Sequence, residues 1–190
     1  MKLLLEKWDR FLNEAVPAYE IEHQKIIAAV DRALQLLELS SNKNLRQFLI
    51  EIAITESAGN PDGIPGKMTH HTKNPFQITD GAIRTLAYRG AKKLDILRNR
   101  IRTNGGIKSP WYMQTPQEIK GTPSMGALAA ALLIIHKMNP RGNDELTKPA
   151  LNATIPSSMP ARAALWKRIY NTGADPHGTP TLYIKRNSLQ

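Results

Sequence analysis

Cysteine is missing altogether from this chain of 190 residues. Its absence excludes a disulfide framework and a thiolate nucleophile, and it fits a reducing compartment without requiring one. Long apolar runs are missing too, since no stretch reaches the roughly 18 consecutive apolar residues of a membrane-spanning helix. The opening sequence MKLLLEKWDRF has a short apolar run followed at once by charges, unlike a secretory signal. We therefore expect a product that is soluble in the cytoplasm when it is made.

Acidic residues are scarce, with 16 Asp and Glu against 26 Lys and Arg and a formal charge of +10. The excess is greatest between residues 84 and 120, where only Asp95 and Glu118 are acidic. A basic surface attracts polyanions such as nucleic acid, anionic wall polymer and lipopolysaccharide, although a solvated helix face explains the pattern equally well. Because no recognition-helix pattern is present, nucleic acid is not the favoured partner.

Apolar residues recur at three- and four-residue spacing along most of the chain, and no useful strand-like alternation occurs. The pattern predicts an all-α protein. Helices are expected over residues 3–16, 19–39, from the candidate caps Ser40, Ser41 and Asn42 to a stop at 59–61, and then over 80–90, 91–103, 123–138 and 161–170. The helix over 123–138 is apolar on all sides, which is typical of a buried central helix.

Glu56 lies near the end of the predicted third helix, at the edge of its buried stripe, just before the stop Gly59-Asn60-Pro61. A carboxylate at a helix C-terminus meets the negative end of the helix dipole, and apolar neighbours add a desolvation cost. Both effects favour the protonated carboxyl, which is the form that a general acid must carry. A plain surface glutamate is the alternative interpretation.

Other catalytic chemistries find little support in the sequence. There is no nucleophile elbow around a serine and no Gly-rich phosphate loop. The one histidine pair, His70-His71, consists of adjacent residues that usually point apart, and the other histidines are scattered. We therefore expect neither a metal site nor a cofactor. Cleavage of a glycosidic bond by general-acid catalysis is the chemistry that remains.

Three segments, in order along the chain, resemble the lysozyme-like soluble lytic transglycosylases. Residues 55–61, TESAGNP, resemble the E-S-x-x-N-P segment of that family. Residues 74–79, NPFQIT, resemble its G-L-M-Q-I segment, with Asn-Pro-Phe in place of Gly-Leu-Met. Residues 169–173, IYNTG, resemble its A-Y-N-A-G segment, and 124–133 fall where the family has its central small-residue helix. The likeness spans roughly residues 43–175.

The resemblance implies a lysozyme-like helical domain that cleaves the β-1,4 bond between N-acetylmuramic acid and N-acetylglucosamine in peptidoglycan. Glu56 would protonate the glycosidic oxygen and then act as base, while the sugar's own 6-hydroxyl attacks and leaves a 1,6-anhydromuramoyl end. Tyr170 would hydrogen-bond or pack against the Glu56 carboxyl. The residues implied to bind the glycan or hold this corner are Ser57, Asn74, Phe76, Gln77, Ile78, Tyr170 and Asn171.

Structural roles compete with these assignments. Phe76 is more naturally a core residue than a ligand contact, and Gln77 can serve simply to hold a loop. Tyr170 and Asn171 can act as ordinary helix-end core and C-cap.

The lack of an obvious second catalytic carboxylate is the main departure from a two-acid glycosidase, which would need a partner about 5–9.5 Å from the acid. Asp62 and Asp80 are the nearest in sequence, and neither stands where the family has a catalytic residue. A hydrolytic lysozyme that uses Glu56 with Asp62 or Asp80 therefore stays open. So does a non-enzymatic basic module that binds nucleic acid or serves as a phage structural part.

The sequence divides into residues 1–40, a helical extension packed on the domain, 41–175, the lysozyme-like catalytic domain, and 176–190, a loosely held basic tail. We expect a monomer whose partners are peptidoglycan strands and, through its charge, an anionic envelope surface. Because no secretory signal is seen, a phage-type lysin or virion-associated enzyme is expected, which reaches the wall through a holin, injection or a secretion machine.

Overall fold

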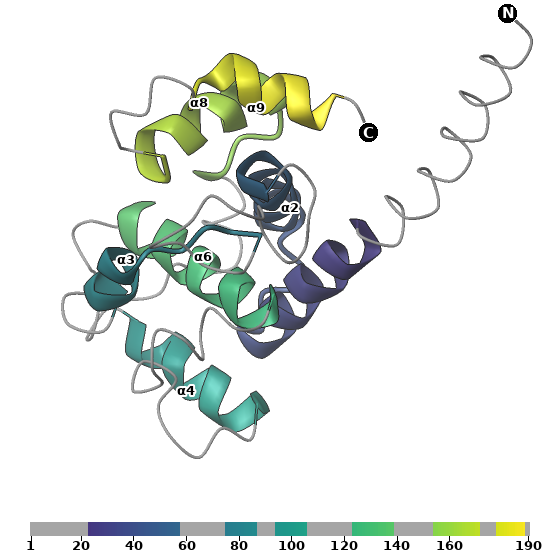
Figure 1. The fold of residues 1–190 in the computed structure, drawn as a ribbon. Coiled ribbons are helices and arrows are strands. Elements are labelled where there is room, and N and C mark those ends of the chain that lie inside the picture. Colours follow the sequence, from purple (N-terminus) through teal and green to yellow (C-terminus); the bar gives the residue numbers. More distant parts are fainter. Residues whose placement is uncertain are drawn as a thin grey trace, which may run out of the picture.

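The structure is a computed structural model, and it describes residues 23–57, 75–86, 94–105, 123–138, 154–171 and 178–188. Over these residues the chain is helical and contains no strand, so the prediction of an all-α protein is confirmed. The helices are α2 (Lys43–Ser57), α3 (Asp80–Arg84), α4 (Asp95–Gly105), α6 (Pro123–Met138), α8 (Met159–Ile169) and α9 (Pro180–Asn187), with a further helix over 23–36 (Figure 1). None of the helices in these ranges is long and apolar enough to cross a membrane.

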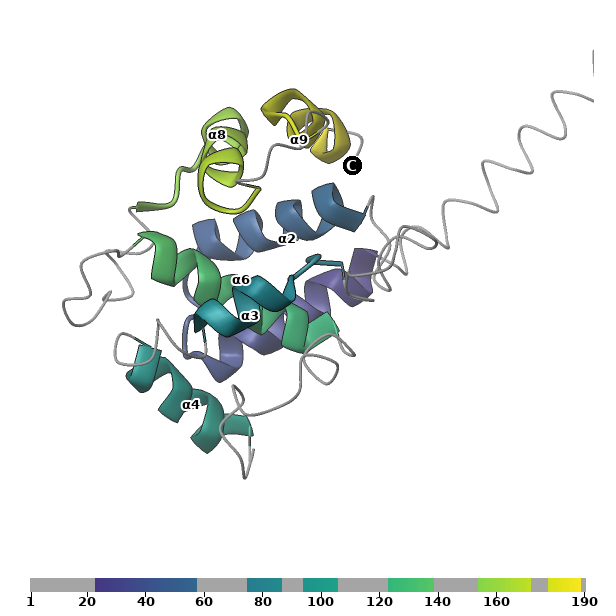
Figure 2. The same cartoon turned by 60° about the vertical axis from the view of Figure 1, so that its left-hand side comes forward.

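Helices α2 and α6 form the centre of the molecule. Figure 2 shows α8 and α9 as a layer on one side of α2, with α6 and the 23–36 helix on the other. All of α6 from Gly126 to Ile135 is buried, which confirms the prediction of a central apolar helix. Helix α2 is buried almost as completely, although Glu51 and Thr55 interrupt its apolar pattern. Helices α2 and α6 are therefore the two most buried helices, and the C-terminal end of α2 lies against the α8–α9 layer.

The helix over 23–36 packs into this core. Ile26, Val30 and Leu34 form a stripe that is at most 1% exposed. On its outer side Asp31 accepts a hydrogen bond at 2.6 Å from Arg46 of α2, with which it forms an ion pair. Buried residues of 26–39 thus belong to the same core as α2 and α6, and residues 1–22 of the predicted N-terminal extension lie outside the described ranges.

A left-handed residue ends the 23–36 helix. Glu38 has a φ of 57°, and the next residue, Leu39, donates its N–H to the Leu34 carbonyl at 2.8 Å, as in a Schellman cap. Glycine is the usual residue at this position, so Glu38 carries some conformational strain. Arg100 and Asn104 of α4 contact Glu38 at 3.3 Å and hold the turn in place.

Helices α2, α3 and α8 start at capping residues that the sequence predicted. Asn42 accepts a hydrogen bond from the Leu45 N–H at 3.0 Å, and Thr79 accepts one from the Ala82 N–H at 3.2 Å. Ser158 is the N-cap of α8, with Pro160 in the first turn. Helix α4 runs to Gly105, beyond the end predicted at residue 103.

The C-terminal segment departs from the prediction of a loosely held tail. Residues Pro180–Asn187 form α9, and the N-cap Thr179 accepts a hydrogen bond from the Leu182 N–H at 3.2 Å. Tyr183 is fully buried, and α9 packs against both α8 and α2. The Pro- and Gly-rich sequence before it suggested a tail, yet Thr179-Pro180 is a helix start signal, with a cap residue followed by proline at N1.

Candidate active site

Glu56 lies in the last turn of α2, where α8 crosses it. Its partly buried carboxyl accepts a hydrogen bond at Oε1 from the indole Nε1 of Trp166, at 2.9 Å. Trp166 is only 1% exposed. Because a buried indole N–H needs an acceptor, this hydrogen bond fixes one oxygen of Glu56. Glu56 itself keeps some access to solvent.

Tyr170 follows Trp166 by one turn and closes the C-terminal end of α8. Its hydroxyl donates a hydrogen bond to the backbone carbonyl of Phe76 at 2.5 Å. Burial, and then the negative charge of Glu56, raise the pKa of Tyr170 well above its usual value. Tyr170 is therefore a neutral hydroxyl close enough to Glu56 to sense its charge. The sequence had suggested Tyr170 as the partner of the Glu56 carboxyl, and it offered no partner for Trp166.

The 76–78 segment combines two anchors with one exposed amide. Phe76 and Ile78 are 0% and 1% exposed and belong to the core, whereas Gln77 between them is partly exposed. Gln77 has a φ of 50°, a left-handed conformation that costs a non-glycine residue about 1–2 kcal/mol. Of these three side chains, solvent reaches that of Gln77, so it is the one available to a ligand.

Two other candidate residues make contacts that hold the structure. Ser57 is 2% exposed, and its hydroxyl donates to the Ala53 carbonyl within α2 at 2.6 Å. Asn171 accepts a hydrogen bond from Lys167 at 3.3 Å. The amide of Asn171 also fills the space beside Gly178, where an added Cβ would lie 2.6 Å from its nitrogen. Ser57 therefore has no direct access to a bound glycan, and Asn171 holds the corner between α8 and α9.

The remaining candidates fall outside the described side chains. Asn74, Asp62 and the His70-His71 pair lie in undescribed residues, and of Asp80 only the backbone is described. Within the described ranges no group of three or more His, Cys, Asp or Glu is placed to hold a metal ion.

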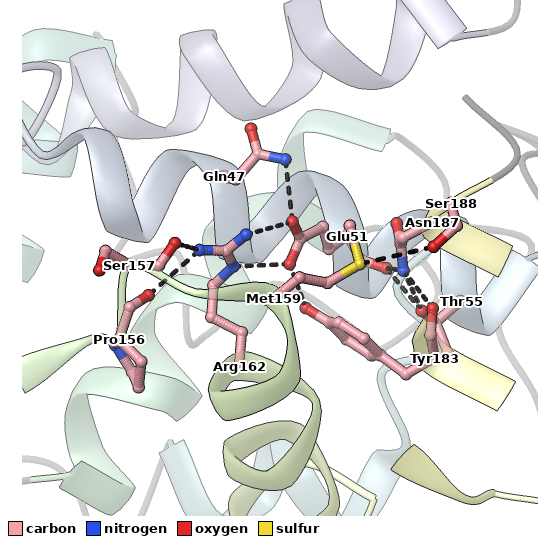
Figure 3. Close-up of polar contacts among 10 residues, drawn as sticks. All are labelled: Gln47, Glu51, Thr55, Pro156, Ser157, Met159, Arg162, Tyr183, Asn187 and Ser188. Carbon is pink, nitrogen blue, oxygen red and sulfur yellow. Dashed lines mark hydrogen bonds and ion pairs between the residues drawn. The ribbon is translucent and has the colours of Figure 1, made fainter. Parts of the chain in front are cut away.

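A second carboxylate on α2, Glu51, lies at the centre of a buried polar cluster that was not among the predicted site residues (Figure 3). It is 1% exposed. Arg162 of α8 binds it through two hydrogen bonds, from Nε to Oε2 at 2.7 Å and from Nη2 to Oε1 at 2.6 Å. Tyr183 of α9 donates to Oε2 at 2.7 Å, and Gln47 donates to Oε1 at 2.9 Å. Each oxygen thus receives two donors, which satisfies a carboxylate in a buried site.

The partners of Glu51 are as well satisfied as the carboxylate itself. Arg162 donates further hydrogen bonds to the carbonyls of Pro156, at 3.2 Å, and Ser157. The hydrogen bond to Glu51 is the main cause that raises the pKa of Arg162. Burial, followed by the charge of Glu51, raises the pKa of Tyr183. With no exposed surface and no free acceptor direction, Glu51 cannot reach a substrate, and its contacts instead fasten α2, α8 and α9 together.

Helix α9 also completes the C-terminal end of α2. The Asn187 side-chain nitrogen donates to the Thr55 hydroxyl at 2.9 Å and to the Glu51 carbonyl at 3.3 Å. Arg186 donates to the Thr55 carbonyl. Because α2 has no basic residue in its own last turn, Arg186 supplies the positive charge that its dipole favours there. The backbone that carries Glu56 is thereby held from α9.

Comparisons of the chain with protein-family models, with curated proteins and with solved structures find no match. The site is therefore defined by its own geometry. A partly open carboxyl at a helix end is held by a buried indole, beside a neutral tyrosine that is hydrogen-bonded to the Phe76–Ile78 segment.

Proposed function

We propose that this protein cleaves the β-1,4 bond between N-acetylmuramic acid and N-acetylglucosamine in peptidoglycan, as a lytic transglycosylase of lysozyme-like fold. One observation carries the proposal. Tyr170, in the last of the three segments that resemble that family, donates a hydrogen bond to Phe76 of the second segment and lies close enough to Glu56 of the first for its charge to raise the pKa of the tyrosine. Motif likenesses that arose by chance would have no reason to meet at one place.

Glu56 acts first as the general acid. It transfers its proton to the glycosidic oxygen, the bond from that oxygen to the muramic acid C1 breaks, and the electron pair leaves with the oxygen. The Glu56 carboxylate then takes the proton of the 6-hydroxyl as that oxygen bonds to C1, which gives the 1,6-anhydro end and restores the acid. Trp166 holds one carboxyl oxygen throughout, and Tyr170 stays protonated because its pKa is raised.

The state of Glu51 supports a mechanism with one carboxylate. It is the other acid of α2, and all four of its donor contacts come from protein groups. It therefore cannot activate a water molecule for hydrolysis. A hydrolytic lysozyme would have to recruit Asp62 or Asp80, and its product would carry a reducing end instead of an anhydro end.

The positive charge of the chain fits a substrate that is embedded in an anionic envelope. We place the activity in phage-type lysis or wall penetration, with the glycan strand as partner and Gln77 as the contact from the 76–78 segment.

The test is digestion of purified sacculi by the wild type and by Glu56→Gln, with mass spectrometry of the released fragments. The wild type should release fragments with anhydro ends, and Glu56→Gln should lose activity by about 10²–10⁴-fold. Glu38→Gln is the matched control, since it removes a carboxylate from the turn held by α4, remote in sequence from the site, and should keep activity. Undiminished release by Glu56→Gln would sink the assignment, and reducing ends would identify a hydrolase.

A further inference from the structure

One face of α8 presents a column of three polar side chains at four-residue spacing, Arg162, Trp166 and Tyr170. Each is bonded to a group far away in the sequence: the Glu51 carboxylate, the Glu56 carboxyl and the Phe76 carbonyl, in that order. The outer two members, Arg162 and Tyr170, hold a buried carboxylate and a backbone carbonyl. The middle member, Trp166, touches the proposed acid.

Trp166 has little freedom to turn away from Glu56. It is 1% exposed, and its ring lies against that of Tyr183, with centroids 5.4 Å apart and an interplanar angle of 41°. Tyr183 is itself held by its hydrogen bond to Glu51 at 2.7 Å. The direction of the indole N–H is therefore set by the buried cluster and not by solvent.

An indole N–H can donate a hydrogen bond but cannot accept one. Trp166 therefore donates to Oε1 of Glu56 whether the carboxyl is protonated or ionised. When the proton leaves, the hydrogen bond from Trp166 becomes charge-assisted and strengthens. An interaction that strengthens as charge develops lowers the barrier more than it stabilises the ground state.

We propose that Trp166 is a positioning residue, which holds the Glu56 carboxyl through Oε1 and stabilises the carboxylate that forms. The role rests on the proposed function for its effect on catalysis. Its structural half, the coupling of the indole N–H to the charge of Glu56, stands without it.

The decisive variant removes the N–H and keeps the shape. Site-specific incorporation of β-(3-benzothienyl)alanine at position 166 replaces the N–H by sulfur, with tryptophan incorporated at the same codon as the matched control. We expect kcat to fall about ten-fold or more with KM little changed. The alkaline limb of the pH profile should move to higher pH, because the carboxylate has lost a donor. Trp166→Phe should show the same shifts with an added loss of stability.

A folded benzothienyl variant with unchanged kcat and pH profile would overturn the proposal. A second readout is independent of turnover: the indole ¹⁵N–¹H NMR signal of Trp166, assigned with Trp166→Phe. This signal should move with pH as Glu56 titrates in the wild type and lose that step in Glu56→Gln. If the signal steps while sacculi stay intact, the proposed function fails and the coupling holds. A signal that is the same in Glu56→Gln would overturn the coupling itself.

Discussion

Two glutamates on the same helix, Glu51 and Glu56, occupy opposite kinds of site. Glu51 is 1% exposed and receives four donors from α2, α8 and α9. Glu56 is partly exposed and accepts a hydrogen bond from the indole N–H of Trp166. A buried carboxylate with all its acceptor directions filled fixes structure, whereas one that solvent can reach can exchange a proton. Exposure to solvent, more than residue type, separates the two roles.

The largest expected effect is the loss of activity when Glu56, and not Glu51, is the glutamate that is replaced. Glu56→Gln should reduce the release of fragments from sacculi by about 10²–10⁴-fold. Its free energy of unfolding should change by less than about 1 kcal/mol, since the amide oxygen still accepts from Trp166. Chemical denaturation of both proteins, alongside the digestion assay, measures the two quantities. A loss of stability as large as that of a buried pair would mean that Glu56 is a structural residue.

The converse variant disrupts the buried ion pair between Glu51 and Arg162. Glu51→Gln leaves the buried guanidinium of Arg162 without a charged partner, so we expect a loss of about 3–5 kcal/mol in the free energy of unfolding. Arg162→Met should cost a similar amount, because it leaves the carboxylate unpaired. The double variant Glu51→Gln/Arg162→Met should be much more stable than the sum of the single losses predicts. Additive losses in this double-mutant cycle would contradict a coupled pair.

The contrast also explains which parts could be predicted from the sequence. The apolar run of α6 and the caps at Asn42 and Thr79 are local signals, and they predicted helices correctly. The Glu51–Arg162 and Trp166–Glu56 contacts join residues 111 and 110 positions apart, and no local pattern encodes such pairing. Glu51 did leave one signal, a charge inside the apolar run FLIEIAI of residues 48–54, which requires a buried partner but does not identify it.

Helix α9 was missed for a different reason. Its eight residues follow a Pro- and Gly-rich stretch and carry a single fully buried aromatic, Tyr183. Isolated helices of that length are marginal, and most helical stability in proteins comes from tertiary packing. Here that packing includes the contacts with Glu51, Thr55 and Trp166, which become visible once α2 and α8 are in place.

Alkaline pH should lower the free energy of unfolding, because Tyr170 and Tyr183 are held neutral in the folded protein. The folded protein keeps Tyr170 and Tyr183 neutral, because burial and a nearby carboxylate raise the pKa of each. Unfolded tyrosine ionises near pH 10, so this contribution is fully present below about pH 10 and is lost as the pH rises further. Each tyrosine should add a slope of up to about 1.4 kcal/mol per pH unit.

Thermal unfolding between pH 9 and 12 measures that slope. Tyr183→Phe should start from a lower stability, since it removes a donor to Glu51, but it should lose stability less steeply above about pH 10. Tyr170→Phe should flatten the slope in the same way and leave the Glu51 cluster intact. A slope that is unchanged in both variants would show that neither phenol is protected in the folded state.

The smallest expected effect concerns Arg186 of α9, which donates a hydrogen bond to the Thr55 carbonyl near the end of α2. Arg186→Gln should lower the free energy of unfolding by about 1 kcal/mol, through the lost hydrogen bond and the lost charge at the end of α2. The neighbouring Lys185→Gln is the matched control: it removes the same charge from an exposed side chain of α9 and should stay within about 0.5 kcal/mol of the wild type. Because the dipole contribution is screened by salt, the difference between the two variants should shrink when the urea titrations are repeated at high salt. An equal effect of both substitutions would mean that net charge, and not the contact with α2, sets the stability of this end of the helix.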